Sequence, residues 1–249
     1  MFAIGQQRQR VSATTNVLQV QPKQGIEDYQ IDNQYFLEPG DPRVGDEIAN
    51  IVAELLKHYP TLDGLQFDYI RYPDVHPAYG YTPWNMKRFK KATGESKIIE
   101  GSKIWNDWKR EQVTGLLKQL VAKTRAIRPK IHISTTGCVS YSRAMEEAFQ
   151  DWPSWVNHNI VEFVTVMDYP IDIQEFKKHI ADAQQRVYDL SKLNVAVGAY
   201  KLIDTPEVFT QQYSICRASG VGGCVVFHYG SLFGREALGR DLVRQNNLP

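Results

Sequence analysis

The chain has 249 residues, with 29 basic and 28 acidic side chains and a formal net charge of +1. This length can bury a substantial core, as one large domain or two small ones. The balanced charge gives no electrostatic support for binding nucleic acid or an anionic membrane. The longest apolar runs span only a few residues, so no transmembrane helix is predicted.

The first forty residues predict little regular structure. Residues 17–21 could form a strand and residues 35–37 a shorter one, but no helix of the expected length joins them. Residues 1–34 are therefore predicted to be a poorly defined N-terminal segment, followed by a folded domain over residues 35–249. Residues 1–24 lack the charged-then-apolar pattern of a secretory signal, and the sequence alone assigns no compartment.

From residue 62 onward, strand and helix patterns alternate. Five short segments rich in Val, Ile, Phe or Thr are typical of β-strands. They are residues 64–68, 130–135, 161–167, 194–200 and 222–227. The last four begin at 130, 161, 194 and 222, which are steps of 31, 33 and 28 residues. A (β/α)8 barrel of about 250 residues repeats about every 31 residues, although doubly wound sheets have similar repeats.

Helices are predicted between these strands. Asp41 and Pro42 supply an N-cap and a first-turn proline for one helix, and Thr205 and Pro206 begin another in the same way. Residues 104–127 place apolar side chains at helical spacing. Parallel strands joined by helices predict an α/β architecture.

The three cysteines, Cys138, Cys216 and Cys224, show no metal-like pairing. They are predicted to be small buried residues of a reduced protein and not a disulfide framework. No cluster of His, Cys and Asp has zinc-ligand spacing. The glycines of residues 220–223 precede a strand instead of opening a helix, so they form no phosphate loop. No metal or other cofactor is predicted.

The most informative segment is LDGLQFDYIRYP, residues 62–73. Apolar side chains alternate with Gln66 and Asp68, so the side chains fall on two faces of a strand. A strand with one polar face suits a barrel strand whose carboxyl end opens into a pocket, where barrel enzymes place their active-site groups. The alternative is that Asp68 caps a helix or holds Arg71.

An aromatic-rich loop follows this strand. Tyr72 and Trp84 could offer flat apolar faces to sugar rings, although each could equally pack within the loop. Arg71 could fix a substrate hydroxyl or hold the Asp68 carboxylate ionised. The alternative for Arg71 is a salt bridge to a loop acid such as Asp74.

Residues 62–73 resemble the strand-four motif D-G-(I/V/L)-x-F-D-(D/Y)-x-R-Y-P of the bacterial glycosyl-hydrolase-like family ten proteins. The similarity continues in the same order through residues 36–42, 105–110, 166–169 and 198–201, and covers about residues 35–234. The resemblance implies a (β/α)8 TIM-barrel type fold that is incomplete at its N-terminus, with about five to six strands visible. The chain resembles the last two-thirds of a family member, and either a misassigned gene start or a truncated barrel would explain this.

The resemblance also implies a function. It suggests a glycoside hydrolase whose carbohydrate partner is a polysaccharide or glycan strand, with peptidoglycan-related strands among the candidates, and export to the cell envelope. The alternative is a non-catalytic carbohydrate-binding remnant, because an unclosed barrel exposes sheet edges. A third hypothesis is a reduced cytoplasmic barrel that acts on small molecules. The sequence predicts no sugar, linkage or oligomeric state.

Two carboxylates are the predicted catalytic groups. Asp68 resembles the strand-four aspartate that is the nucleophile of related barrel glycosidases, and is predicted to be a nucleophile or charge stabiliser. Retaining glycosidases need a second carboxyl about 5 Å away, and inverting ones need it about 6.5–9.5 Å away. Asp168, at the end of the strand two positions on, is the predicted general acid, unless it only caps the following segment. Glu146 and Glu147 are weaker rivals on a solvated helix face.

The remaining binding residues are predicted at the other strand ends. Tyr169 follows Asp168, and Tyr200, Lys201 and His228 follow the last two strands. Lys201 suits recognition of a hydroxyl or carboxylate. His228 could exchange protons near neutral pH, or could be a hydrogen-bonded histidine of the barrel.

Overall fold

The computed structural model describes residues 2–3, 35–74 and 79–233. Within them, six parallel strands form one sheet in the order β1-β2-β3-β4-β5-β6. They are β1 (Phe2–Ala3), β2 (Gly64–Asp68), β3 (His132–Cys138), β4 (Phe163–Asp168), β5 (Leu193–Val197) and β6 (Gly223–Val226). Neighbours in this sheet are also neighbours in sequence. This is the order of a barrel, because a doubly wound sheet reverses its strand order.

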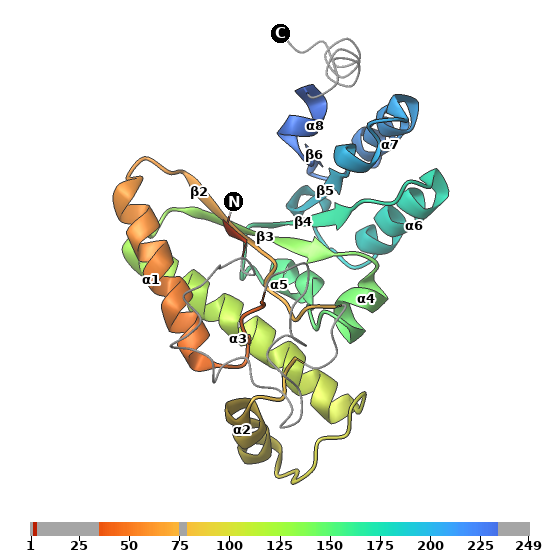
Figure 1. Cartoon of the computed structure of the whole chain (residues 1–249). Coiled ribbons are helices and arrows are strands. Elements are labelled where there is room, and N and C mark those ends of the chain that lie inside the picture. Colours follow the sequence, from red (N-terminus) through yellow and green to blue (C-terminus); the bar gives the residue numbers. More distant parts are fainter. Residues whose placement is uncertain (1, 4–34, 75–78, 234–249) are drawn as a thin grey trace.

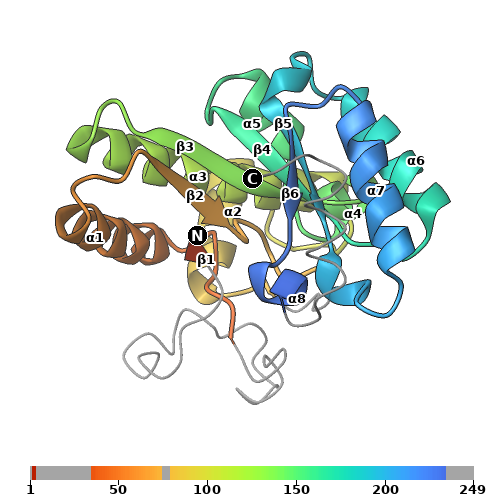
Figure 2. The same cartoon turned by 90° about the horizontal axis from the view of Figure 1, so that it is seen from above.

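Helices link the strands and cover the sheet. They are α1 (Pro42–His58), α2 (Pro83–Thr93), α3 (Lys103–Ile127), α4 (Tyr141–Glu146), α5 (Trp152–Asn157), α6 (Ile173–Gln184), α7 (Pro206–Ala218) and α8 (Tyr229–Phe233), with 3-10 turns η4 (Leu190–Lys192) and η5 (Ala199–Lys201). Figures 1 and 2 show α1, α3, α6 and α7 along one side of a curved sheet. The predicted fold class, an incomplete (β/α) barrel, is confirmed.

Several predicted boundaries agree with the structure. Strand β2 and the start of α1 lie where the sequence predicts them, and the Asp41 side chain caps α1 by accepting from the Arg43 N–H. Strand β3 begins two residues later than predicted and runs on to Cys138. The short strand predicted at residues 35–37 is wrong, since these residues have no regular structure. The strand predicted at residues 17–21 lies outside the described residues.

The two faces of the sheet differ in chemistry. Phe67, Ile133 and Val164 point to the helix side and are fully buried. On the opposite face the Ser134 hydroxyl donates to Gln66 Oε1 at 3.3 Å. Because side chains alternate along a strand, this polar face is the one that turns toward the inside of a barrel. The alternation predicted for β2 is therefore a property of the neighbouring strand as well.

Cys216 and Cys224 form a disulfide between α7 and β6. The prediction of three reduced cysteines is wrong for this pair. Cys216 lies in the last turn of α7, and a turn through Gly220, with φ of 78°, brings the chain back into β6. The two Cα atoms are consequently 6.1 Å apart, a separation that a disulfide can span. Cys138 is a free, buried thiol.

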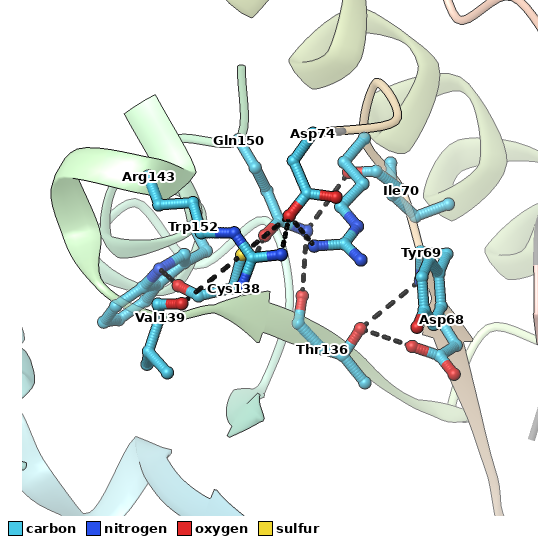
Figure 3. Close-up of polar contacts among 11 residues, drawn as sticks. Asp68, Tyr69, Ile70, Asp74, Thr136, Cys138, Val139, Arg143, Gln150 and Trp152 are labelled. Atoms are coloured by element: carbon cyan, nitrogen blue, oxygen red, sulfur yellow. Dashed lines mark hydrogen bonds and ion pairs between the residues drawn. The ribbon is translucent and has the colours of Figure 1, made fainter. Parts of the chain in front are cut away.

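One buried side chain joins the segment that follows β2 to the last residues of β3. Gln150 has no exposed surface. Its Oε1 accepts from the Cys138 N–H at 2.7 Å, and its Nε2 donates to the carbonyls of Ile70 at 3.2 Å and Thr136 at 3.1 Å (Figure 3). The backbone pairing between β2 and β3 ends at Phe67 and Thr135, before these residues. The amide of Gln150 therefore replaces the backbone pairing there.

Replacing Gln150 by Ala should lower the free energy of unfolding by about 3 kcal/mol, because three buried backbone groups lose their partner. Gln174, exposed on α6, is the matched control, and Gln174→Ala should change the free energy by less than about 0.5 kcal/mol. Urea denaturation of both variants measures the difference. Equal stabilities of the two variants would contradict the role assigned to Gln150.

Candidate active site

A cavity of about 550 Å³ lies at the carboxyl ends of β2, β3, β4 and β5. Its size falls in the range of small-molecule sites, and its position is that of active sites in TIM barrels. Most of its wall consists of residues at or just beyond the ends of these strands. The lining residues are Tyr69, Arg71, Cys138, Val139, Ser140, Arg143, Met167, Asp168, Tyr169, Pro170, Glu175, His179, Tyr200 and Lys201.

Asp68 ends β2 and is only 7% exposed. Its Oδ1 accepts from the Thr136 hydroxyl at 2.6 Å, and the same hydroxyl oxygen accepts from the Tyr69 N–H at 3.3 Å (Figure 3). Burial raises the pKa of Asp68, while the Thr136 hydrogen bond and the charge of Arg71 lower it. Asp68 lies just behind the cavity wall, which begins at Tyr69. Thr136 therefore both orients this carboxylate and favours its ionised form.

A left-handed turn ends β2 directly after Asp68. Tyr69 has φ of 59°, which is uncommon for a residue with a side chain. Its ring lies 4.3 Å from the guanidinium of Arg71, within cation–π distance. Arg71 also contacts the Asp74 carboxylate at 3.5 Å, and Arg143 of α4 binds the same carboxylate. The salt bridge that the sequence allowed as the alternative for Arg71 is thus present.

Asp168 ends β4 but faces the helices. Thr165 of the same strand pairs with Thr136 of β3, and the Thr136 side chain binds Asp68. Thr165 therefore lies on the same face of the sheet as Asp68. Three positions separate Thr165 from Asp168, so the pleat turns these two side chains to opposite faces. The carboxylates of Asp68 and Asp168 therefore do not form the facing pair that the sequence predicts.

His179 of α6 binds Asp168. Its Nδ1 lies 2.7 Å from Asp168 Oδ1, and the side chains are 14% and 1% exposed. Burial raises the pKa of Asp168 to about 6, against the hydrogen bond and charge of His179. The hydrogen bond to Asp168 raises the pKa of His179.

Aromatic rings border the cavity at the ends of β4, β5 and β6. The Tyr169 ring stacks on Phe227 with centroids 5.6 Å apart and meets Tyr200 edge-on at 5.7 Å. Gly198 makes this packing possible, because a Cβ there would lie 2.9 Å from the Cβ of Tyr169. Burial raises the pKa of the Tyr169 phenol, and the charge of Asp68 raises it further. Tyr169 thus lies within electrostatic reach of Asp68.

The structure brings Asp168, Arg71, Tyr169, Tyr200 and Lys201 to the cavity wall, as their positions at strand ends predict. Besides Asp68, three predicted residues do not line it: Tyr72, Trp84 and His228. The first two belong to the loop that follows β2 and to α2, and the third is exposed beyond β6.

Tyr72 packs inside the protein, which is the alternative that the sequence left open for it. It is 1% exposed and meets the ring of Phe149 edge-on at 5.6 Å. Burial and the nearby carboxylate of Glu38 raise its pKa well above the usual range. The buried carboxylate of Glu38 accepts from the Gly80 N–H at 2.8 Å. This hydrogen bond ties the loop before α2 to the protein interior.

Trp84 and His228 lie at the surface. Trp84 is 47% exposed near the start of α2, where the guanidinium of Arg43 is 5.8 Å from its ring. His228 stacks on Tyr200 with centroids 6.4 Å apart, and its Nε2 is 3.3 Å from the Ser231 hydroxyl. His228 therefore supports the aromatic rim without lining the cavity.

Sequence reasoning missed two residues that shape the site, Thr136 and His179. Thr136 lies one residue beyond the predicted end of its strand. His179 lies on α6, a helix whose start was not predicted although Asp172 caps it by accepting from the Glu175 N–H at 2.7 Å. An acidic N-cap followed three residues later by glutamate is a known signature of a helix start.

Comparisons with known proteins identify the family and the fold of this chain. The model of the family Glycosyl hydrolase-like 10 matches residues 2–214. This chain belongs to that family. The family predicted from the strand-four motif is thus confirmed.

The curated relatives have low sequence identity to this chain and are longer than it. Glycosyl hydrolase DigH of Escherichia coli (strain K12) and that of Shigella flexneri are each 24% identical to this chain over 155 residues, 55% of this chain and 32% of the relative. The matched region is therefore about a third of the length of these curated relatives.

A solved structure shows the same fold. A catalytic mutant of Gan42B, a GH42 beta-galactosidase from G. stearothermophilus, superposes with a TM-score of 0.57 at 13% identity, over 91% of this chain and 40% of that one. At this identity the likeness shows the TIM-barrel fold alone.

Two further observations apply to the part of the chain that the structure describes. None of its helices has both the length and the apolar character needed to cross a membrane. Its His, Cys, Asp and Glu side chains form no group of three or more that could hold a metal ion.

Replacing Thr136 by Val should raise the pKa of Asp68 further, because the lost hydrogen bond favours the ionised carboxylate. Thr136→Ser keeps a hydroxyl and should leave the pKa close to that of the unmodified protein. Carbon-13 NMR of the aspartate carboxyl groups across a pH series measures both. A pKa of Asp68 that stays the same or falls in Thr136→Val would show that the hydroxyl does not stabilise the carboxylate.

Proposed function

We propose that this chain forms the catalytic barrel of a glycoside hydrolase that acts on a polysaccharide or glycan strand. The observation that carries the proposal is the Asp68 carboxylate, fixed by Thr136 at the carboxyl end of a barrel strand and next to a cavity of about 550 Å³. Membership of a glycosyl hydrolase-like family supports the reaction class. The name of the relatives, glycosyl hydrolase, supports it as well.

Two acidic groups in different surroundings supply the chemistry. Asp68 acts as nucleophile or stabilises the positive charge that develops on the sugar ring in the transition state. The second group is Asp168 with its partner His179. Burial raises the pKa of Asp168 to about 6, and the hydrogen bond to Asp168 raises the pKa of His179, so the pair can carry a proton on the imidazole and deliver it to the leaving group.

The cavity wall supplies groups for binding a sugar. The rings of Tyr169 and Tyr200 offer apolar faces with polar edges. Arg71 and Lys201 can donate to hydroxyl or carboxylate groups. Together with the family resemblance, these groups favour a peptidoglycan-related glycan strand as the substrate.

The disulfide supports export of the protein. Cys216 and Cys224 are bonded, and such bonds persist mainly in oxidising compartments. A glycan of the cell envelope lies in such a compartment.

A second candidate function is carbohydrate binding without catalysis. It is favoured by the position of Asp68 behind the cavity wall and by the exposure of Val225, 38%, on the last strand of the described sheet. Calorimetric binding of a glycan that releases no reducing ends would support this alternative.

Replacing Asp68 by Asn should reduce the turnover of the substrate by about 1,000-fold or more, because the amide is neither a nucleophile nor a negative charge. The control is Asp63→Asn, an exposed residue just before the start of the same strand, which should retain full activity. Release of reducing ends from a glycan panel that includes peptidoglycan strands measures both. Equal turnover by the unmodified protein and Asp68→Asn would remove Asp68 from the mechanism.

A further inference from the structure

His179 is a titratable side chain of the cavity that no sequence motif indicates. It belongs to α6 and lines the cavity wall. Its Nδ1 is occupied by Asp168 at 2.7 Å. Its Nε2 lies 3.8 Å from Glu175 Oε1, which is too long for a hydrogen bond. Nε2 is therefore the ring nitrogen that remains available to a bound molecule.

Asp168 cannot take that place itself. Its side chain is 1% exposed on the helix face of β4, and its Oδ2 has no hydrogen-bond partner among the described residues. A carboxylate accepts hydrogen bonds and cannot donate them, so it selects the histidine tautomer that carries a hydrogen on Nδ1. This leaves the lone pair or the second proton on Nε2, on a side chain that lines the cavity.

We propose that Nε2 of His179 exchanges the proton with the substrate and that Asp168 is a positioning residue that fixes the imidazole. The inference rests on the proposed hydrolase function and names the atom through which its acidic pair acts. His179 would be a catalytic residue, whereas Asp168 would act only through it.

The proton transfers balance over two steps. The imidazolium first donates its Nε2 proton to the glycosidic oxygen as the bond from that oxygen to the anomeric carbon breaks, and the bonding electron pair leaves with the oxygen as an alcohol. The Asp68 carboxylate bonds to the anomeric carbon or stabilises its charge. Neutral Nε2 then removes a proton from a water whose oxygen bonds to the anomeric carbon, and Asp68 is released. One water is consumed, and the imidazolium is restored.

Three acidic groups surround His179. Asp168 faces it from β4, and Glu175 and Asp182 lie on its own helix. All three favour the protonated ring, with Asp168 first through its hydrogen bond. Activity that needs the imidazolium should therefore fall as pH rises through the pKa of His179. Removing the charge of Asp168 should move that fall to lower pH.

The test compares two substrates that differ in their need for a proton. One is the glycan that the unmodified protein cleaves, and the other is the 2,4-dinitrophenyl glycoside of the same sugar, whose leaving group departs without protonation. His179→Gln should lower kcat/KM for the glycan by about 100- to 10,000-fold and for the dinitrophenyl glycoside by less than about 10-fold. Retained cleavage of the second substrate also shows that the variant is folded. The control His158→Gln, at an exposed histidine outside the cavity, should match the unmodified protein.

The role of Asp168 is tested by the pH profile of kcat/KM for the glycan. Asp168→Asn should move the alkaline limb to lower pH, and NMR titration of the His179 imidazole should show a lower pKa in the same variant. Equal losses of His179→Gln on both substrates, or no loss on the glycan, would overturn the role of His179. An unchanged profile and imidazole pKa in Asp168→Asn would overturn the positioning role. An unmodified protein that cleaves neither substrate would instead refute the hydrolase function itself.

Discussion

The buried amide of Gln150 is the constraint on which the site depends. Strands β2 and β3 stop pairing through their backbones before the chain reaches the cavity, and the three hydrogen bonds of Gln150 continue the connection. They hold Thr136 and Ile70 on either side of the left-handed turn at Tyr69. The Thr136 hydroxyl can then reach Asp68, and the carboxylate is held at the edge of the sheet with Asp68 only 7% exposed.

The pleat of the sheet then decides which acidic groups can cooperate. It turns Asp68 to the polar face and Asp168 to the helix face, so the two carboxylates at the ends of the alternate strands β2 and β4 do not face each other. His179 of α6 connects the two, because it binds Asp168 and also lines the cavity. The proposed mechanism thus uses a carboxylate from the sheet and a proton from helix α6. Tyr169 and Tyr200 border the same cavity just beyond the ends of β4 and β5.

Local patterns predicted the parts of this arrangement that depend on neighbouring residues. The alternation in β2 predicted a polar face ending in Asp68. The repeat of about thirty residues suited a barrel or a doubly wound sheet, and the resemblance of residues 62–73 to a family motif predicted the barrel. The orientation of Asp168 could also have been predicted from the sequence. Alternate residues of a strand point to the same face, so Asp168 lies on the apolar face of β4 with Val164 and Val166. Tyr72 could not be predicted, since its burial depends on Glu38, which lies 34 positions earlier in the chain. The Cys216–Cys224 bond likewise depends on how α7 returns to β6.

The most direct test of the account is a crystal structure of Asp68→Asn with an uncleaved oligosaccharide bound. The account predicts an anomeric carbon within about 3.5 Å of the side chain of residue 68. It also predicts a glycosidic oxygen within hydrogen-bond reach of His179 Nε2, with a sugar ring against Tyr169 or Tyr200. A glycan that lies away from the cavity, or one whose scissile bond contacts neither residue 68 nor His179, would contradict it.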